Sequence, residues 1–167
     1  MKVLFKITSS LLKRVREDLV RTHEFAAERV GFLSWRAAKL RPRGLVILAH
    51  DYHPVSDNDY VNDSTVGAMM GSEAIRKALQ FAYGNEVGMA HVHMHDHCGS
   101  PCPSRTDLSE TAKFVPDFWH VKPQMPHGAI IVSRDSISGR CWYPGRSKPV
   151  EITEVTIVGA PLILIRN

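Results

Sequence analysis

Four histidines occupy every second position of one short segment, and this spacing constrains the fold more than any other feature of the chain. They are His91, His93, His95 and His97, in the stretch AHVHMHDHCGSPCPSRTD over residues 90–107. Alternate residues of a β-strand point to the same face of a sheet, so the spacing predicts a strand over residues 87–95. Two adjacent imidazoles on one face can share a divalent metal ion.

A third metal ligand has to come from outside this strand, and the residues that follow the histidines offer one. Ser104 and Asp107 form an S-x-x-D pattern, which is typical of a helix that begins after a serine cap. We expect a helix over 104–115 with Asp107 in its first turn. A loop from the strand end would return Asp107 to the histidines, and a catalytic zinc site has three protein ligands of this kind.

The composition is that of an ordinary globular domain. The chain has 167 residues, of which 44% are hydrophobic and 23% are charged, and this length predicts a single domain over residues 1–167. The net charge of +4 is spread along the chain, without the aromatic and basic motif of an RNA-binding module. We therefore expect no nucleic-acid partner. The chain lacks a long apolar run or a good signal peptide, so we also expect no membrane association.

The cysteines favour a reducing compartment. There are three, Cys98, Cys102 and Cys141, which is too few for a disulfide framework, and a cytoplasmic location is therefore expected. Cys98 and Cys102 form a C-x3-C spacing without a matching second pair, so we do not expect a structural cysteine zinc site.

Hydrophobic periodicity predicts strands alternating with helices. Strands are expected at residues 2–8, 30–35, 45–49, 87–95, 128–133 and 139–143, with one or two more within 150–165. Helices are expected at 9–23, capped by Ser9 or Ser10, at 72–83, capped by Ser72, and at 104–115. Residues 50–65 and 116–126 are expected to be irregular connections. This order predicts a mixed α/β fold, with a central sheet flanked by helices.

Hydrolysis at a zinc site also requires a general base that is not itself a ligand. The upstream candidates are Glu24, Glu28, Glu73 and Glu86. Glu28 stands immediately before the first buried strand, in ERVGFL, whereas Glu73 and Glu86 lie where ordinary surface residues are common. The residues alone leave this choice open.

In combination, these residues resemble the JAMM, or MPN-plus, zinc metalloprotease family (Mov34/JAB). Its pattern is a distant glutamate, an H-x-H at a strand end and an S-x-x-D. Glu28-x-x-Gly31-Phe32-Leu33, VGMAHVHMHDH and Ser104-x-x-Asp107 are similar to this pattern, and PHGAIIVSRD is similar to bacterial members. The resemblance covers nearly the whole chain. It implies a JAB/MPN-type central mixed β-sheet flanked by helices, in a cytidine-deaminase-like architecture.

The resemblance also implies an activity. A deubiquitinase-like zinc isopeptidase or peptidase would cleave after the C-terminal tail of a ubiquitin-like protein. Two histidines and Asp107 would hold Zn²⁺, Glu28 would be the general base, and Ser104 would donate a hydrogen bond to the oxyanion. The implied partners are the ubiquitin-like protein or its conjugates and E1-like and E2-like enzymes, as in bacterial antiphage conjugation systems. The alternatives are a protease that processes a sulfur-carrier protein and a non-catalytic scaffold of the same fold.

The spacing departs from the family pattern, which leaves the metal-binding pair of histidines open. The family has seven residues between the second histidine and the serine. Here eight residues separate His95 from Ser104, and the corresponding numbers for His97 and His93 are six and ten. We predict His93 and His95 as ligands, with one inserted residue, and His91 and His97 as alternates. The segment H-x-H-D-H over 93–97 also comes close to the H-x-H-x-D-H of metallo-β-lactamases, but it lacks the spacer and the chain is short for that fold.

Overall fold

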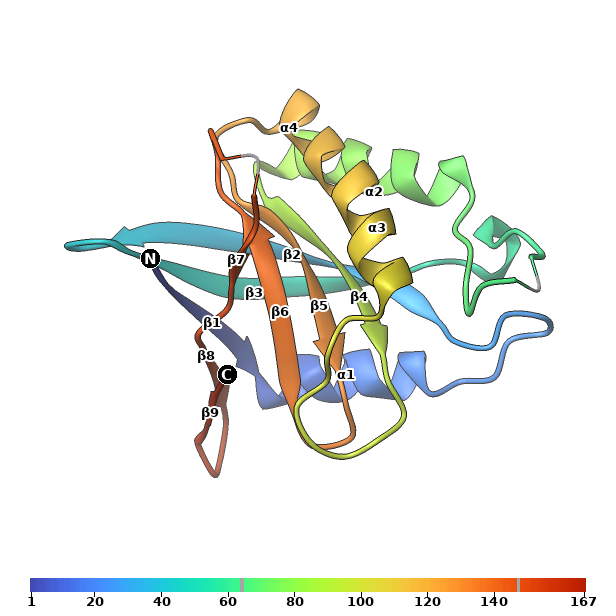
Figure 1. Cartoon of the computed structure of the whole chain (residues 1–167), viewed down its shortest axis with the longest axis horizontal. Coiled ribbons are helices and arrows are strands. Elements are labelled where there is room, and N and C mark those ends of the chain that lie inside the picture. Colours follow the sequence, from blue (N-terminus) through green and yellow to red (C-terminus); the bar gives the residue numbers. More distant parts are fainter. Residues whose placement is uncertain (64, 147) are drawn as a thin grey trace.

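A computed structural model describes residues 1–63, 65–146 and 148–167, and shows one curved sheet with helices on both faces (Figure 1). Within these residues the sheet has nine strands, in the order β7-β6-β5-β4-β2-β3-β1-β8-β9. The pairs β1–β3, β1–β8 and β4–β5 are parallel and the other neighbours are antiparallel. The mixed α/β class that the periodicity predicts is confirmed.

The elements alternate along the chain much as expected. The strands are β1 (Lys2–Thr8), β2 (Val30–Leu40), β3 (Gly44–Pro54), β4 (Gly88–Met94), β5 (His127–Val132), β6 (Ile137–Trp142), β7 (Val150–Glu151), β8 (Glu154–Val158) and β9 (Ile163–Arg166). The helices are α1 (Ser9–Leu19), α2 (Ser72–Asn85), α3 (Arg105–Phe114) and α4 (Phe118–Val121), with 3-10 turns η1 (Asp57–Asp59) and η2 (Val115–Asp117). Of the described residues, no helix is long and apolar enough to cross a membrane.

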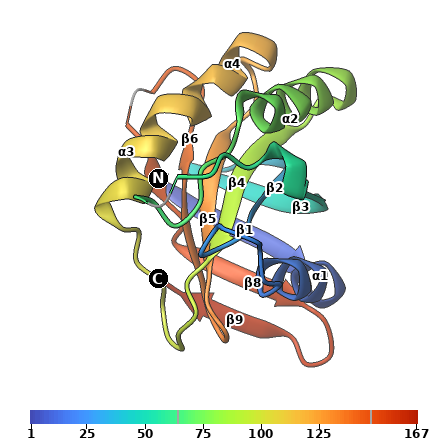
Figure 2. The same cartoon turned by 90° about the vertical axis from the view of Figure 1, so that its right-hand side faces the viewer.

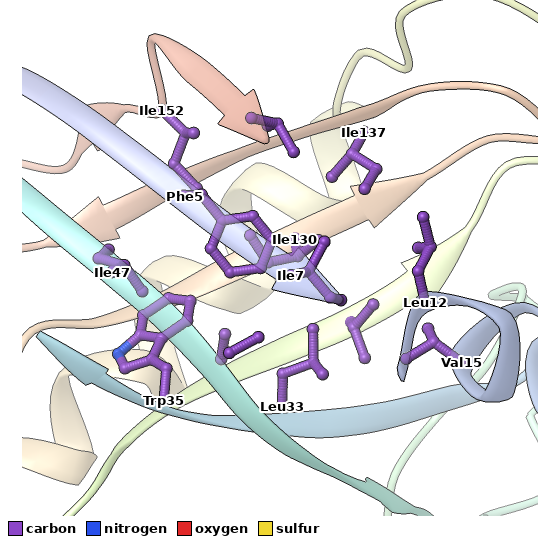
Figure 3. Close-up of a cluster of buried hydrophobic side chains, with 14 of the residues drawn as sticks. Phe5, Ile7, Leu12, Val15, Leu33, Trp35, Ile47, Ile130, Ile137 and Ile152 are labelled. Carbon is purple, nitrogen blue, oxygen red and sulfur yellow. The ribbon is translucent and has the colours of Figure 1, made fainter. Parts of the chain in front are cut away.

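The helices divide between the two faces of the sheet. Helix α1 covers one face, and its buried side chains join a large core with residues of the central strands (Figure 3). Helices α2, α3 and α4 lie on the opposite face (Figure 2), where alanines of α2 and Phe118 of α4 pack on residues of β2 and β4. Because residues of β4 alternate between these faces, Ala90 and Val92 join the first core while Met89 joins the second. The histidines of β4 therefore point toward α2 and α3.

Two of the expected boundaries are wrong because tertiary contacts override local pattern. Residues 50–54 belong to β3 rather than to a loop, since Asp51–Pro54 pair with Gly31–Ser34 of β2. Helix α1 ends at Leu19, well before the expected residue 23. Just beyond it, the carbonyl oxygens of Arg21 and Thr22 accept hydrogen bonds from the buried guanidinium of Arg29, which holds that segment in a non-helical path.

Smaller corrections concern helix starts and the end of the chain. Thr8 rather than Ser9 or Ser10 caps α1, because its hydroxyl accepts from the N–H of Leu11. Gly71 rather than Ser72 stands at the cap of α2, without a side-chain bond. The connection expected over 116–126 contains η2 and α4. The end of the chain forms three strands instead of one or two, because β7 pairs with β6 while β8 joins β1 at the other edge.

Candidate metal centre

Three of the predicted site residues converge at the C-terminal end of β4. His93 lies near the end of this strand, His95 lies just beyond it, and Asp107 is in the first turn of α3. The two Nε2 atoms are 3.1 Å apart. The Asp107 carboxylate places Oδ1 at 3.3 Å from Nε2 of His93 and Oδ2 at 3.5 Å from Nε2 of His95. In the described part of the chain, these three residues form the group that could hold a metal ion.

The spacing of these ligand atoms suits a small tetrahedral ion. Zinc–nitrogen and zinc–oxygen bonds of about 2.0–2.1 Å at tetrahedral angles place ligand atoms about 3.3 Å from one another. The three separations of 3.1, 3.3 and 3.5 Å fall around this value. The donor set of two imidazoles and one carboxylate leaves one tetrahedral position free, as a catalytic zinc site requires.

The strand explains why His93 and His95 face the same way. Strand β4 pairs in parallel with β5 up to Met94 opposite Val132. The N–H of His95 then donates to the carbonyl of Val132 at 3.0 Å, so the extended ladder continues for one residue beyond the strand. Alternation along this extension keeps the two imidazoles on one face of the sheet.

The alternate ligands His91 and His97 lie outside the group. His97 follows a tight turn, in which its N–H donates to the carbonyl of His95 at 2.8 Å, and its exposed ring bonds through Nδ1 to the carbonyl of Cys98. His91 is buried, and its ring packs edge-on against Phe32 and Phe114. Burial lowers the pKa of His91 to about 3. The strand therefore uses His91 as a neutral packing residue.

A capping box places Asp107. The N–H of Ser104 donates to Oδ2 of Asp107 at 2.7 Å, and the N–H of Asp107 donates to Oγ of Ser104 at 3.1 Å. Ser104 is thus the N-cap of α3, as the S-x-x-D pattern predicts. Burial alone would raise the pKa of Asp107, but hydrogen bonds from His93 and Ser104 and the His93 charge hold this pKa well below its ordinary value. Asp107 is therefore ionised, which is the form that binds a metal.

Glu28 does not belong to this group of ligands and lies in a bend just before β2. Strands β2 and β4 are antiparallel, and their pairing begins two residues after Glu28, with Val30 opposite His93. The N–H groups of Ala27 and Glu28 both donate to the carbonyl of Gly67, at 2.8 and 3.2 Å. A Cβ at Gly67 would collide with Oε1 of Glu28. Gly67 thus lets the Glu28 carboxylate lie directly against the loop backbone.

Arg29 fixes the backbone next to Glu28. Its side chain is only 3% exposed, and its guanidinium pairs with the carboxylate of Asp57 at 2.6 Å. Neither Arg29 nor Gly67 is among the residues predicted from the sequence. No local pattern reveals either residue, because their contacts depend on how the segment before β2 meets the loop between β3 and α2.

Most of the aspartates in residues 50–65, the region expected to be a loop, form ion pairs within the molecule. Asp51 pairs with Arg14 at 3.1 Å, Asp57 pairs with Arg29 at 2.6 Å, and Asp59 pairs with Lys77 at 2.7 Å. These carboxylates connect β3 to α1, and the loop that follows β3 to Arg29 and α2.

A small cavity lies beside the metal-binding group. It is lined by His93, Asp107, Pro103 and Thr111 on one side and by residues of β5, β6 and β7 on the other. Its volume of about 20 Å³ is close to that needed for one water molecule. In the described part of the chain, all three cysteines are free thiols, and they stand apart from the metal-binding group.

No protein-family model matches this sequence, and no curated protein matches it.

Proposed function

We propose that this chain is a zinc-dependent isopeptidase or peptidase of the JAMM type, which cleaves after the C-terminal tail of a ubiquitin-like protein. The observation that carries the proposal is the convergence of His93, His95 and Asp107 at separations that suit tetrahedral zinc. The sheet with helices on both faces is compatible with the JAB/MPN architecture, and Glu28 and Ser104 complete the residue pattern of that family.

The chemistry would divide between the ion and two side chains. When bound, zinc would polarise the scissile carbonyl and lower the pKa of a water molecule. Glu28 would accept a proton from the attacking water and return it to the leaving amine. Ser104 would donate its hydroxyl hydrogen to the carbonyl oxygen as negative charge develops there. Oγ of Ser104 also accepts from the N–H of Asp107.

The arrangement of the carboxylates supports this division of roles. Asp107 is held at the imidazoles by the capping box, which suits a ligand. Glu28 lies outside the group of converging ligand atoms and two residues before Val30, which pairs with His93, and this is compatible with a base. A scaffold that binds partners without catalysis would not require this complete set, so we favour an enzyme.

The partner is inferred from the residue pattern alone. We propose a ubiquitin-like protein or its conjugates as substrate. The E1-like and E2-like enzymes of the same cytoplasmic bacterial system would be further partners, and one form of such a system acts in antiphage defence. Processing of a sulfur-carrier protein would use the same site and the same reaction, so the two substrates have to be separated by experiment.

The test begins with elemental analysis of the purified chain, for which we expect about one equivalent of zinc. The chain is then assayed on an isopeptide-linked ubiquitin dimer and on a sulfur-carrier protein extended at its C-terminus. Glu28→Gln should retain zinc and lose cleavage, whereas Glu86→Gln, an exposed control paired with Lys122, should cleave normally. A chain without zinc, or a Glu28→Gln variant that cleaves at the wild-type rate, would refute the proposal.

A further inference from the structure

The two parts of the metal-binding group are joined by an irregular loop. Residues 96–103 contain no helix or strand, and Asp96–Ser100 are exposed. A loop of this kind costs conformational entropy to order, and it carries His95 at one end and leads to Asp107 at the other. The contacts that hold this loop in place therefore affect how well the ligands are ordered before an ion binds.

The anchors converge on the turn between β5 and β6, which lies beside the loop in Figure 1. The guanidinium of Arg134 donates to both carboxylate oxygens of Asp96, at 2.6 and 3.0 Å. The backbone N–H of Arg134 donates to the carbonyl of His97 at 3.0 Å. On the far side of the loop, the hydroxyl of Ser138 donates to the carbonyl of Pro101.

Gly99 is held on both of its backbone groups. Its N–H donates to Oδ1 of Asp135 at 2.7 Å, and its carbonyl accepts from the hydroxyl of Ser133 at 2.7 Å. Its φ of +91° lies in a region that favours glycine. Ser133 is fully buried, and its Oγ also accepts from the N–H of Ser136 at 2.9 Å. The same hydroxyl also lies 3.2 Å from Oδ1 of Asp135, so Ser133 contacts both the Gly99 carbonyl and the carboxylate that binds the Gly99 N–H.

The turn is itself braced by α1. The side chain of Arg16 donates from Nε to the carbonyl of Ser133 at 3.1 Å and from Nη2 to the carbonyl of Ser136 at 3.4 Å. The turn thus connects the loop to α1, on the opposite face of the sheet.

We propose that this turn, Ser133–Ser136, is a positioning element for the metal centre, with Ser133 and Asp135 as its positioning residues. The inference rests on the proposed function, since it assumes that His93, His95 and Asp107 bind zinc. By holding Gly99, the turn orders the loop before the ion arrives, so that binding does not have to supply the ordering free energy. Groups that orient metal ligands from outside typically change metal affinity by about 10–100-fold when they are removed.

The test measures metal binding rather than activity. Dissociation constants for Zn²⁺ are determined by chelator competition, and the absorption spectrum of the Co²⁺-loaded protein reports the coordination geometry. We expect Ser133→Ala and Asp135→Ala each to weaken Zn²⁺ binding by about tenfold or more and to alter the Co²⁺ spectrum. The control is Ser100→Ala. This serine is an exposed residue of the same loop whose side chain makes no hydrogen bond to another described residue, and its replacement should change neither quantity.

The outcomes separate this inference from the proposed function. Wild-type protein that binds no zinc would overturn both. Wild-type protein that binds zinc, together with an Asp135→Ala variant whose affinity lies within about twofold of it, would overturn the positioning role alone. Asp135 is exposed, so Asp135→Ala decides the question even if Ser133→Ala fails to fold. Thermal unfolding without metal serves as the folding control.

Discussion

Nε2 of His93 and Nε2 of His95 lie 3.1 Å apart, and both face the carboxylate of Asp107. Two imidazole nitrogens approach so closely only if one donates a hydrogen bond to the other or both bind a common ion. A proton held between them and an ion held between them require nearly the same side-chain positions. The ligands are thus arranged by the fold, and metal binding should require little movement.

The choice between histidine pairs is the first prediction. His95→Ala should reduce bound zinc from about one equivalent to less than a tenth, because a site with two remaining protein ligands loses most of its affinity. His97→Ala should retain zinc, since the His97 ring is exposed and bonds to the Cys98 carbonyl instead. Elemental analysis of the two purified variants checks both statements. The reverse result would assign the site to a different pair.

Ser104 should show two separable roles. Ser104→Ala removes the cap of α3 and should cost about 1 kcal/mol of unfolding free energy, whereas Ser104→Gly should cost only a few tenths. Both variants lack the hydroxyl, so both should lower kcat by about 10²–10³-fold. Urea unfolding and cleavage kinetics are measured on the same preparations. If activity falls in proportion to lost stability, with Ser104→Gly close to wild type, Ser104 is a cap and nothing more.

Gly67 should control the position of Glu28. Gly67→Ala introduces a Cβ where Oε1 of Glu28 lies, so the carboxylate has to move. A displacement of about 1 Å can cost about 10²-fold in rate, while the zinc content should remain at the wild-type level because the ligands are untouched. The control is Gly84→Ala in α2, where an added Cβ meets no described atom within 4 Å. Cleavage by Gly67→Ala at the wild-type rate would remove Glu28 from the mechanism or show that it adjusts freely.

His127 should make the fold sensitive to acid. This buried ring accepts from the N–H of Met89 through Nδ1 and bonds to the Lys122 carbonyl through Nε2, an arrangement that only a neutral imidazole can satisfy. Burial lowers the pKa of His127 from 6.5 to about 4, although the Lys122 carbonyl partly opposes the shift. Between these two values the unfolded chain binds the proton more readily than the folded chain. Stability is therefore complete above pH 6.5 and falls as the pH drops toward 4, by about 3 kcal/mol.

The measurement is the unfolding free energy as a function of pH, with a chelator present. His127→Gln should be less stable than wild type at pH 7 but should lose less stability between pH 6.5 and 4. His120→Gln, which changes an exposed histidine of α4, should follow the wild-type curve. A His127→Gln profile parallel to that of wild type would show that His127 does not titrate in this range.

Much of the fold could be predicted because its signals are local. The alternation in β4, the apolar face of α1 and the Ser104 cap each depend on residues a few positions apart. The predicted β5–β6 hairpin is present with its ends shifted by one or two residues. The grouping of His93, His95 and Asp107 could also be predicted, because a strand end and a helix start joined by a short loop can meet in few ways.

Other features depend on contacts between distant segments. The pairing of Asp51–Pro54 with β2 turns an apparently polar loop into a strand, and the contact of Gly67 with Glu28 joins parts of the chain without a shared pattern. The hydrogen bonds that Gly99 accepts from Ser133 and donates to Asp135 likewise depend on the order of the strands in the sheet.

The sequence by itself determined the elements and the types of residue available for a metal site, since periodicity and capping are properties of short segments. Only the tertiary structure decided which histidines face Asp107. One residue more or fewer in an extended strand reverses the direction of a side chain, and the hydrogen bond from His95 to Val132 settles that direction at the strand end. The ordering of the ligands before an ion binds likewise depends on the tertiary structure, because the loop between the ligands is held by a turn from another part of the sheet.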